Sequence, residues 1–199
     1  FLAQRLRARH QSRTVEDRGA RQFPPRHVLR NGHGALRAVH VLGVGRANTT
    51  SDIAVRQEDL LDIAQRAGLD VLWRENQTGC KGVCLRVPTE TLTHEHSHAY
   101  CDDGECHDAI LLAGLEERLA ATTKDALIVL HMMGSHGPAY FKRYPQSFAR
   151  FKPECKETQF SHCTAEELIN AYDNTILYTD HVLADLIGLL QRVAGRGIA

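Results

Sequence analysis

Between residues 56 and 73, the spacing of apolar residues changes from that of a helix to that of a strand. After Arg56, apolar side chains recur on one helical face, and Gly68 stands where a C-terminal cap is expected. The apolar run 69–73 then predicts a short buried strand. The helical residues expected to face the core are Leu60, Leu61, Ile63 and Ala64.

The same order is repeated between residues 107 and 130, after loops expected at 76–84 and 89–103. The segment 107–121 predicts one continuous helix, with an apolar stripe of Ile110, Leu111, Leu115 and Leu119. The apolar run 126–130 predicts a second strand after a short connection. Helices that alternate with strands are typical of an α/β fold, in which helices cross over a parallel sheet.

A long final helix is predicted to begin at Thr164, which forms a capping box with Glu167. Asp173, Asp180 and Asp185 are expected on its solvated face. The helical pattern stops abruptly at the tail 195–199. The buried face is expected to contain Leu168, Tyr172, Ile176, Leu183, Ile187 and Leu190.

Residues 131–145, directly after the second predicted strand, combine histidines with residues that disfavour regular structure. Gly134, Gly137 and Pro138 favour an irregular loop, while His131 and His136 supply imidazoles that bind zinc or transfer protons near neutral pH. Loops at strand ends carry the chemistry of many α/β folds, so a functional site is expected here. A purely structural role, with the ring hydrogen-bonded in the core, is the alternative for each histidine.

As a string, residues 131–145 (HMMGSHGPAYFKRYP) resemble the corresponding loop of the phosphoethanolamine transferases that modify lipid A, including the mobile colistin-resistance enzymes. The similarity continues through RQEDLL (56–61), VLWRENQTGCKGVC (71–84), FARFKPEC (148–155) and LINAYDN (168–174). The resemblance implies that residues 45–194 are the central part of that family's catalytic domain. It implies a fragment of an alkaline-phosphatase/sulfatase-like α/β/α sandwich.

The resemblance also implies a reaction and a set of site residues. The family transfers phosphoethanolamine from phosphatidylethanolamine to lipid A or core lipopolysaccharide at the periplasmic face of the inner membrane, using a zinc-activated threonine. By motif position, Lys81 and Gln77 contact the head group, Gln77 replacing the family's usual Asn. His136 contacts the phosphate or a second zinc, and His131 is assigned a structural role. An exposed lysine without a ligand is the alternative for Lys81.

The six cysteines form three close pairs whose spacing fits two different kinds of site. Local pairs in an even number fit disulfides in an oxidising compartment. A small zinc-binding module is the competing interpretation, because His94, His96 and His98 lie between the first two pairs. The resemblance favours disulfides, since these transferases face the periplasm and carry such bridges. The expected pairs are Cys80–Cys84, Cys101–Cys106 and Cys155–Cys163.

Charge is distributed unevenly, although 24 basic and 24 acidic residues give the 199-residue chain no net charge. Residues 1–46 hold ten Arg, no Lys and two acids, a net of +8, so the remainder carries −8. Nucleic-acid-binding arms commonly mix Lys and aromatic residues with Arg, so no nucleic-acid partner is expected. A one-base shift of permitted codons turns residues 28–42 into SCGTATALSVPCMFS, which is similar to the family's nucleophile segment. Residues 1–44 are therefore expected to be an out-of-frame, poorly ordered segment.

The resemblance also shows which family motifs are missing. The nucleophilic threonine has no counterpart in the translated chain, and the zinc-binding Val-Gly-Glu-Thr and Ser-Asp-His-Gly-Glu-Ser segments are expected before residue 1 and after residue 199. The chain as given is therefore expected to be inactive. No apolar run is long enough to span a bilayer, although full-length relatives are membrane-anchored. A sulfatase or phosphatase relative is the enzymatic alternative, but the formylglycine-type motif that would favour it is not present.

Overall fold

The computed structural model describes residues 55–77, 79–93, 98–102 and 105–195. The predicted out-of-frame segment 1–44 and the tail from residue 196 lie outside the described residues. The α-helices are α4 (Leu60–Arg66), α5 (Leu115–Ala121) and α6 (Ala165–Gly195). The strands are β1 (Asp70–Glu75), β2 (Thr89–Thr91), β3 (Cys101–Asp102), β4 (Glu105–Cys106) and β5 (Ala126–His131). Short 3-10 helices are η2 (His98–Tyr100), η3 (Asp108–Leu112), η4 (Tyr140–Lys142), η5 (Gln146–Phe148) and η6 (Phe160–His162).

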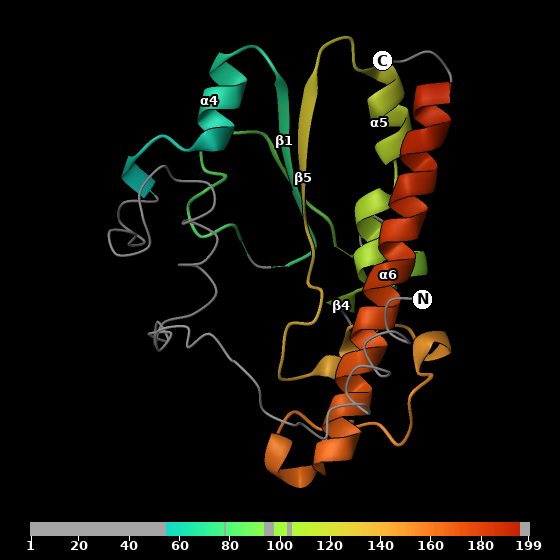
Figure 1. The fold of residues 1–199 in the computed structure, drawn as a ribbon. Coiled ribbons are helices and arrows are strands. Elements are labelled where there is room, and N and C mark those ends of the chain that lie inside the picture. The colour runs from blue at the N-terminus through green and yellow to red at the C-terminus, as the bar shows by residue number, and fades with distance from the viewer. Residues whose placement is uncertain (1–54, 78, 94–97, 103–104, 196–199) are drawn as a thin grey trace, which may run out of the picture.

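Three parallel strands form the central sheet in the order β2-β1-β5. β1 and β5 pair over their full length, with Asp70 opposite Ala126 and Glu75 opposite His131. α4 lies on one side of this sheet, and α5 and α6 lie on the other (Figure 1). The predicted α/β/α arrangement is therefore confirmed, and both strands start within one residue of their expected positions.

Apolar side chains line both faces of the sheet, since successive strand side chains point to opposite sides and helices lie on each side. Val71 and Trp73 pack on the α4 side, while Ile128 and Leu130 pack on the α6 side. The α4 side of the core also contains Leu61, Ala64, Val83 and Val87, and the α6 side also contains Leu115, Leu189 and Val193.

α4 is confirmed, but half of its predicted core face is wrong. Leu61 and Ala64 are buried, whereas Leu60 and Ile63 are 53% and 49% exposed. Leu61 and Ala64 are three residues apart and share one stripe of the helix, and β1 covers only that stripe. Gly68 follows the helix with a φ of 99°, which agrees with the predicted cap.

The prediction of one continuous helix over 107–121 is wrong. η3 and α5 are separate, and between them Gly114 has a φ of 68°, in the left-handed region that favours glycine. The break lets the two pieces pack differently, because Ile110 and Leu111 reach the end of β5 while Leu115 packs against α6. The predicted loop 89–103 likewise contains β2, η2 and β3.

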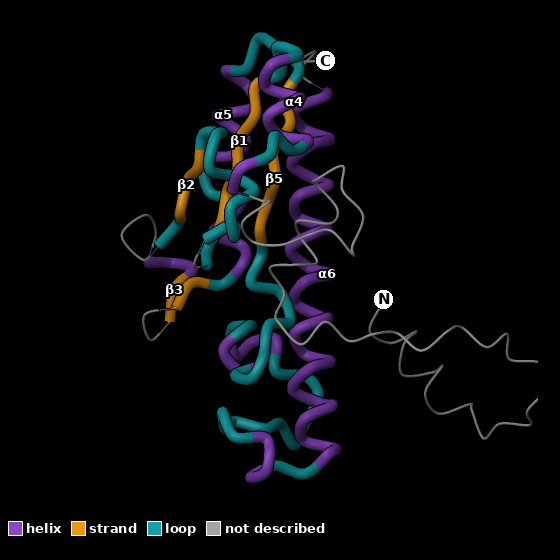
Figure 2. The backbone as a smooth tube through the Cα atoms, turned by 90° about the vertical axis from the view of Figure 1, so that its left-hand side faces the viewer, coloured by secondary structure: helices purple, strands orange, loops and turns teal. Residues whose placement is uncertain are grey.

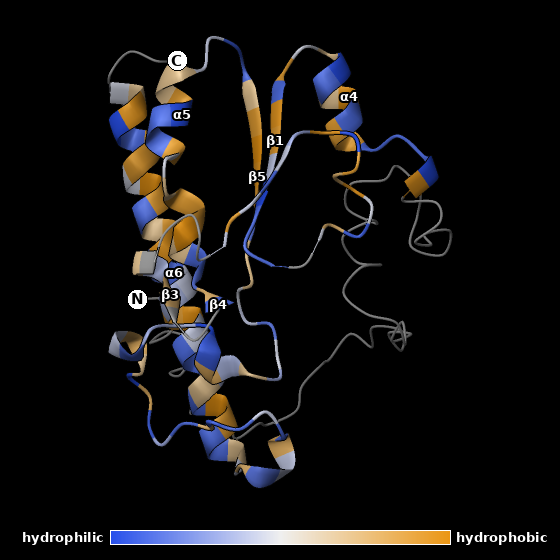
Figure 3. Cartoon of the chain, turned by 180° about the vertical axis from the view of Figure 1, so that it is seen from behind, coloured by the Kyte–Doolittle hydropathy of each residue, from blue (hydrophilic) through white to orange (hydrophobic). Residues whose placement is uncertain are grey.

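α6 begins at the predicted capping box, in which Thr164 and Glu167 each accept a hydrogen bond from the other's backbone N–H. The helix begins beside the loops that follow β5 and then runs alongside the sheet (Figures 1 and 2). Hydrophobic and hydrophilic residues alternate along α6 (Figure 3), but its predicted buried face is wrong. Leu168 and Ile176 are half-buried, and four other members of that face are 43% to 56% exposed, namely Tyr172, Leu183, Ile187 and Leu190.

Polar residues occupy part of the true buried face of α6 because they bind loop backbone. The Asn174 Oδ1 atom accepts from the N–H groups of Arg150 and Phe151, at 3.0 and 2.8 Å. Asn170 Nδ2 donates to the Pro153 carbonyl at 2.7 Å. The buried residues are Asn170, Ala171, Asn174, Thr175, Tyr178, Val182, Leu189 and Val193.

Candidate functional site

The candidate site lies where the parallel strands end, at the carboxyl edge of the sheet. Glu75 is the last residue of β1 and pairs with His131, the last residue of β5. Two loops therefore leave the sheet side by side, the β1 loop (residues 76–88) and the β5 loop (residues 132–145). Gln77 and Lys81 lie in the β1 loop, and His136 lies in the β5 loop. This edge is the usual ligand-binding position of open α/β sheets.

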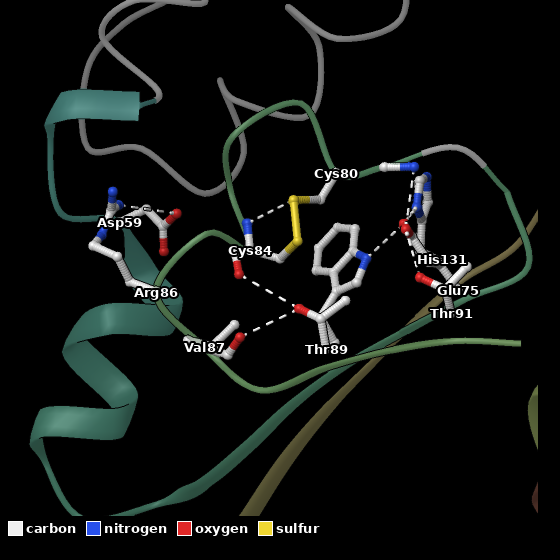
Figure 4. Close-up of a disulfide and its surroundings, with 11 residues drawn as sticks. Asp59, Glu75, Cys80, Cys84, Arg86, Val87, Thr89, Thr91 and His131 are labelled. Atoms are coloured by element: carbon white, nitrogen blue, oxygen red, sulfur yellow. Dashed lines mark hydrogen bonds and ion pairs between the residues drawn. A yellow bond between two sulfur atoms is a disulfide. The ribbon is translucent and has the colours of Figure 1, made fainter.

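Glu75 and His131 form a buried pair at this edge, 3% and 8% exposed. His131 Nδ1 lies 3.0 Å from Glu75 Oε2, which also accepts from the Trp73 indole N–H at 2.9 Å. Glu75 Oε1 accepts from the Gly79 backbone N–H at 3.1 Å and from the Thr91 hydroxyl at 3.5 Å. Figure 4 shows His131 and Thr91 converging on this carboxylate. The histidine is thus held in the core, in agreement with its predicted structural role.

Gln77 ties the two loops together directly. Its Nε2 atom lies 2.7 Å from the Met132 carbonyl oxygen and 2.7 Å from His131 Nε2. Both partners belong to β5 or to the residue that follows it, so the amide crosses from one loop to the other. Gln77 is one methylene longer than the Asn expected from the resemblance. This longer side chain contacts Met132 and His131.

Asp108, at the start of η3, fastens the same two loops from a third direction. Its Oδ1 atom accepts from the Met133 backbone N–H at 2.8 Å and from the Asn76 side-chain amide at 2.9 Å. Its Oδ2 atom accepts from the Gly134 backbone N–H at 2.8 Å. Asn76 also accepts from the Met133 N–H and donates to the Cys106 carbonyl. The buried Asp108 carboxylate therefore fixes the entry to the β5 loop.

His136 is held within the β5 loop by its own neighbour. Its Nδ1 atom lies 2.8 Å from the Gly137 carbonyl, which only accepts hydrogen bonds, so Nδ1 carries the proton. In the neutral ring, Nε2 then bears the lone pair that a metal or an acidic proton needs. Arg143 donates to the His136 carbonyl at 2.8 Å and pairs with Glu105, which anchors the far side of the loop.

Lys81 lies in the turn of the β1 loop closed by the Cys80–Cys84 disulfide. Its φ of 54° is unusual for a residue other than glycine, and its side chain is exposed. The described hydrogen bonds bring Gln77 to the β5 loop, but they do not join Lys81 to Gln77 or to His136. The structure thus presents Lys81 as an exposed cation beside the strand-end edge.

All three cysteine pairs expected from the resemblance are disulfides in the structure, and no cysteine is free. The alternative of a zinc module built on these cysteines is therefore wrong, because a bridged cysteine has no thiolate to offer a metal. The histidines at 94 and 96 lie outside the described residues, and the side chain of His98 is likewise not described.

The zinc implied by the resemblance does not find a complete ligand set in the described ranges. Among those residues, no group of three or more His, Cys, Asp or Glu is placed to hold a metal ion. His136 offers a single nitrogen, whereas protein zinc sites use three or four protein ligands. The described residues alone therefore do not make the primary zinc site.

Three residues that organise this edge were not singled out from the sequence: Glu75, Asn76 and Asp108. Glu75 and Asn76 lie inside the quoted segment 71–84, so their polar character directly after an apolar strand was an available signal. Asp108 gave no such signal, because an acidic residue at a helix start is ordinarily explained by the helix dipole.

Comparison with known proteins agrees with this architecture. The sulfatase family model matches residues 36–195. The phosphoethanolamine transferase EptA of Salmonella typhimurium is 47% identical over 146 residues, which are 73% of this chain and 27% of that protein. The phosphatidylethanolamine transferase Mcr-1 of Escherichia coli is 44% identical over 147 residues, 70% of this chain and 27% of that protein. The chain thus spans about a quarter of the length of these relatives.

Solved structures show the same fold. The soluble domain of lipooligosaccharide phosphoethanolamine transferase A from Neisseria meningitidis superposes with a TM-score of 0.70 at 42% identity, covering 77% of this chain and 46% of that domain. The periplasmic domain of EptC from Escherichia coli, solved in complex with zinc, has a TM-score of 0.51 at 27% identity and covers 67% of this chain and 39% of that one.

In the described part of the chain, no helix has the length and apolar character needed to cross a membrane. The superposition with the Neisseria meningitidis domain covers 77% of this chain, so the shared fold extends over most of it. The extent of the family match and the agreement of the fold show that the chain belongs to the sulfatase family, in which the relatives it resembles are phosphoethanolamine transferases.

Proposed function

We propose that the chain is part of an enzyme that transfers phosphoethanolamine from phosphatidylethanolamine to lipid A or core lipopolysaccharide at the periplasmic face of the inner membrane. The observation that carries the proposal is the Gln77 bridge, because it ties the loop of Gln77 and Lys81 to the loop of His136 at one sheet edge. The names of the phosphoethanolamine and phosphatidylethanolamine transferases it resembles support the substrate class.

The proposed roles follow from the chemistry of each side chain. Lys81 is an exposed cation that attracts a phosphate ester, and its ammonium group provides donors to the phosphoryl oxygens. His136 adds a ring nitrogen from the opposite loop. The described residues hold no group of ligands that could bind a metal ion, and the proposal is that this chain alone binds the head group without transferring it. The zinc of the complete enzyme is part of this proposal.

Titration calorimetry with O-phosphoethanolamine tests this proposal on the 199-residue chain. Lys81→Ala removes one charge-assisted contact, so it weakens binding by about tenfold or more. The matched control is Lys124→Ala, an exposed lysine just before β5 at the opposite end of the sheet. An equal effect of both substitutions, or no binding by the native chain, would contradict the proposal. A transfer assay with labelled phosphatidylethanolamine is expected to give no product.

We also propose that residues 1–44 are translated from a shifted frame of a longer transferase gene. The arginine-rich composition and the permitted nucleophile sequence at 28–42 support this interpretation. The sulfatase match begins at residue 36, so residues 36–44 match the family as translated and count against a shifted frame over that part. The nucleotide sequence decides the matter: an alternative frame without the threonine segment would rule the proposal out.

A further inference from the structure

The Gln77 amide has two neighbours whose chemistry fixes its orientation. A backbone carbonyl only accepts hydrogen bonds, so the Gln77 atom 2.7 Å from the Met132 oxygen must be the nitrogen. The same nitrogen lies 2.7 Å from His131 Nε2, which must then accept the second amide hydrogen. The Met132 carbonyl therefore determines both the orientation of the Gln77 amide and the unprotonated state of His131 Nε2.

Glu75 fixes the other side of the histidine ring. Its carboxylate oxygens accept hydrogen bonds from the Trp73 indole N–H and the Gly79 backbone N–H, so the carboxylate acts as an acceptor. His131 Nδ1, 3.0 Å away, is consequently a donor as well. The ring is the neutral tautomer with its proton on Nδ1, and Nε2 is available to hold the Gln77 amide. Glu75 and His131 are both more than nine-tenths buried, so water does not compete for the His131 ring nitrogens or the Glu75 carboxylate.

The consequence concerns what Gln77 offers to a ligand. Both amide hydrogens are used inside the protein, and in the described ranges Oε1 accepts no hydrogen bond. Phosphoryl oxygens need donors, which Gln77 no longer has, whereas an ammonium group needs acceptors. Lys81 has the reverse character, since its ammonium group only donates.

We propose that Glu75 and His131 are positioning residues that fix the Gln77 amide with Oε1 as its only open atom, so that Gln77 selects the primary ammonium of the head group and leaves the phosphate to other residues. This inference rests on the proposed function for the identity of the ligand. The state of the three side chains stands on the geometry alone.

Nitrogen NMR of the histidine rings tests the positioning in the native chain without any substitution. The expected spectrum shows His131 with Nδ1 protonated and Nε2 unprotonated. A proton on Nε2 overturns the proposal, because the Gln77 nitrogen then faces another donor.

Calorimetry with two ligands, O-phosphoethanolamine and ethyl phosphate, tests the selectivity. The native chain is expected to prefer the ligand with the ammonium group by about tenfold, the effect of one hydrogen bond to a charged group. His131→Leu frees the amide to rotate and is expected to remove this preference with little change for ethyl phosphate. His131→Gln places an acceptor near the former Nε2 position and is expected to restore it. His162→Leu, at an exposed histidine, is the matched control and keeps the preference.

The outcomes separate the two proposals. Equal affinity of the native chain for both phosphate esters overturns the role of Gln77 while the proposed function stands. Binding of neither ligand overturns the proposed function as well as the selectivity. Loss of the preference in the His162→Leu control also contradicts the inference, because that residue does not contact Gln77.

Discussion

Asp108 is the residue whose replacement tests the organisation of the site most directly. Its carboxylate accepts three hydrogen bonds, from the backbone of Met133 and Gly134 and from the Asn76 side chain. Asp108→Asn keeps the shape of the side chain but replaces one oxygen with an NH2 group. At least one part-buried N–H then faces another donor, and the remaining bonds lose their charge.

The size of the effect follows from those three contacts. A hydrogen bond to a charged group contributes about 1.5 to 3 kcal/mol, and a buried donor without an acceptor costs a similar amount. We therefore expect Asp108→Asn to lower the free energy of unfolding by about 3 kcal/mol. Urea unfolding followed by circular dichroism measures this change, and Asp125→Asn, at an exposed carboxylate, is the control.

Hydrogen exchange shows whether the loss is local. The amide protons of Met133 and Gly134 are expected to exchange faster in Asp108→Asn, while those in the middle of β1 keep their relative protection. The reasoning would be refuted if the free energy of unfolding of the variant lay within about 0.5 kcal/mol of the native value, the size of an ordinary surface effect. Unchanged exchange rates at these two amides would refute it as well.

Three further predictions concern the framework around the site. Gly114→Ala places a side chain at a φ of 68° and is expected to destabilise the chain by about 1 to 2 kcal/mol. Gly188→Ala, within α6, is expected to stabilise it by about 1 kcal/mol. Urea unfolding checks both, because the two changes in the free energy of unfolding have opposite signs. Burial raises the pKa of Tyr178 to about 12, so the stability that it contributes is present below pH 10 and is lost as the pH rises towards 12; unfolding midpoints across that range, compared with Tyr178→Phe, measure it. Intact mass without reductant is expected to lie six hydrogens below the reduced chain, two for each of the three disulfides.

Strands and caps could be predicted from the sequence because they depend on local pattern. The apolar run 126–130 and the capping box of Thr164 both appear where expected. The positions of the loop residues came from the resemblance, which placed Gln77 and His136 on loops that the structure shows leaving adjacent strands.

The buried face of α6 could not be predicted, because hydropathy ranks isoleucine and leucine above asparagine. Asn174 is fully buried because its side-chain oxygen accepts from the backbone N–H groups of residues 150 and 151, a contact that the local pattern does not show. Gly114 was missed for a related reason. The apolar stripe continues across it, so only its left-handed backbone shows that the helix is interrupted.

The bonds made by Asn170 and Asn174 have a consequence for how this sequence can vary. Apart from the Asn174 contacts with the Tyr144 hydroxyl and the Glu154 carboxylate, they reach backbone atoms of residues 150, 151 and 153. These backbone contacts do not depend on which side chains residues 150, 151 and 153 carry. Exposed Arg150 and Lys152 are therefore free to change between natural variants, while the two asparagines are not. A deep mutational scan of the segment is expected to show tolerance along the loop and intolerance at two positions about twenty residues away on α6, so that selection acts on the helix to preserve the path of the loop.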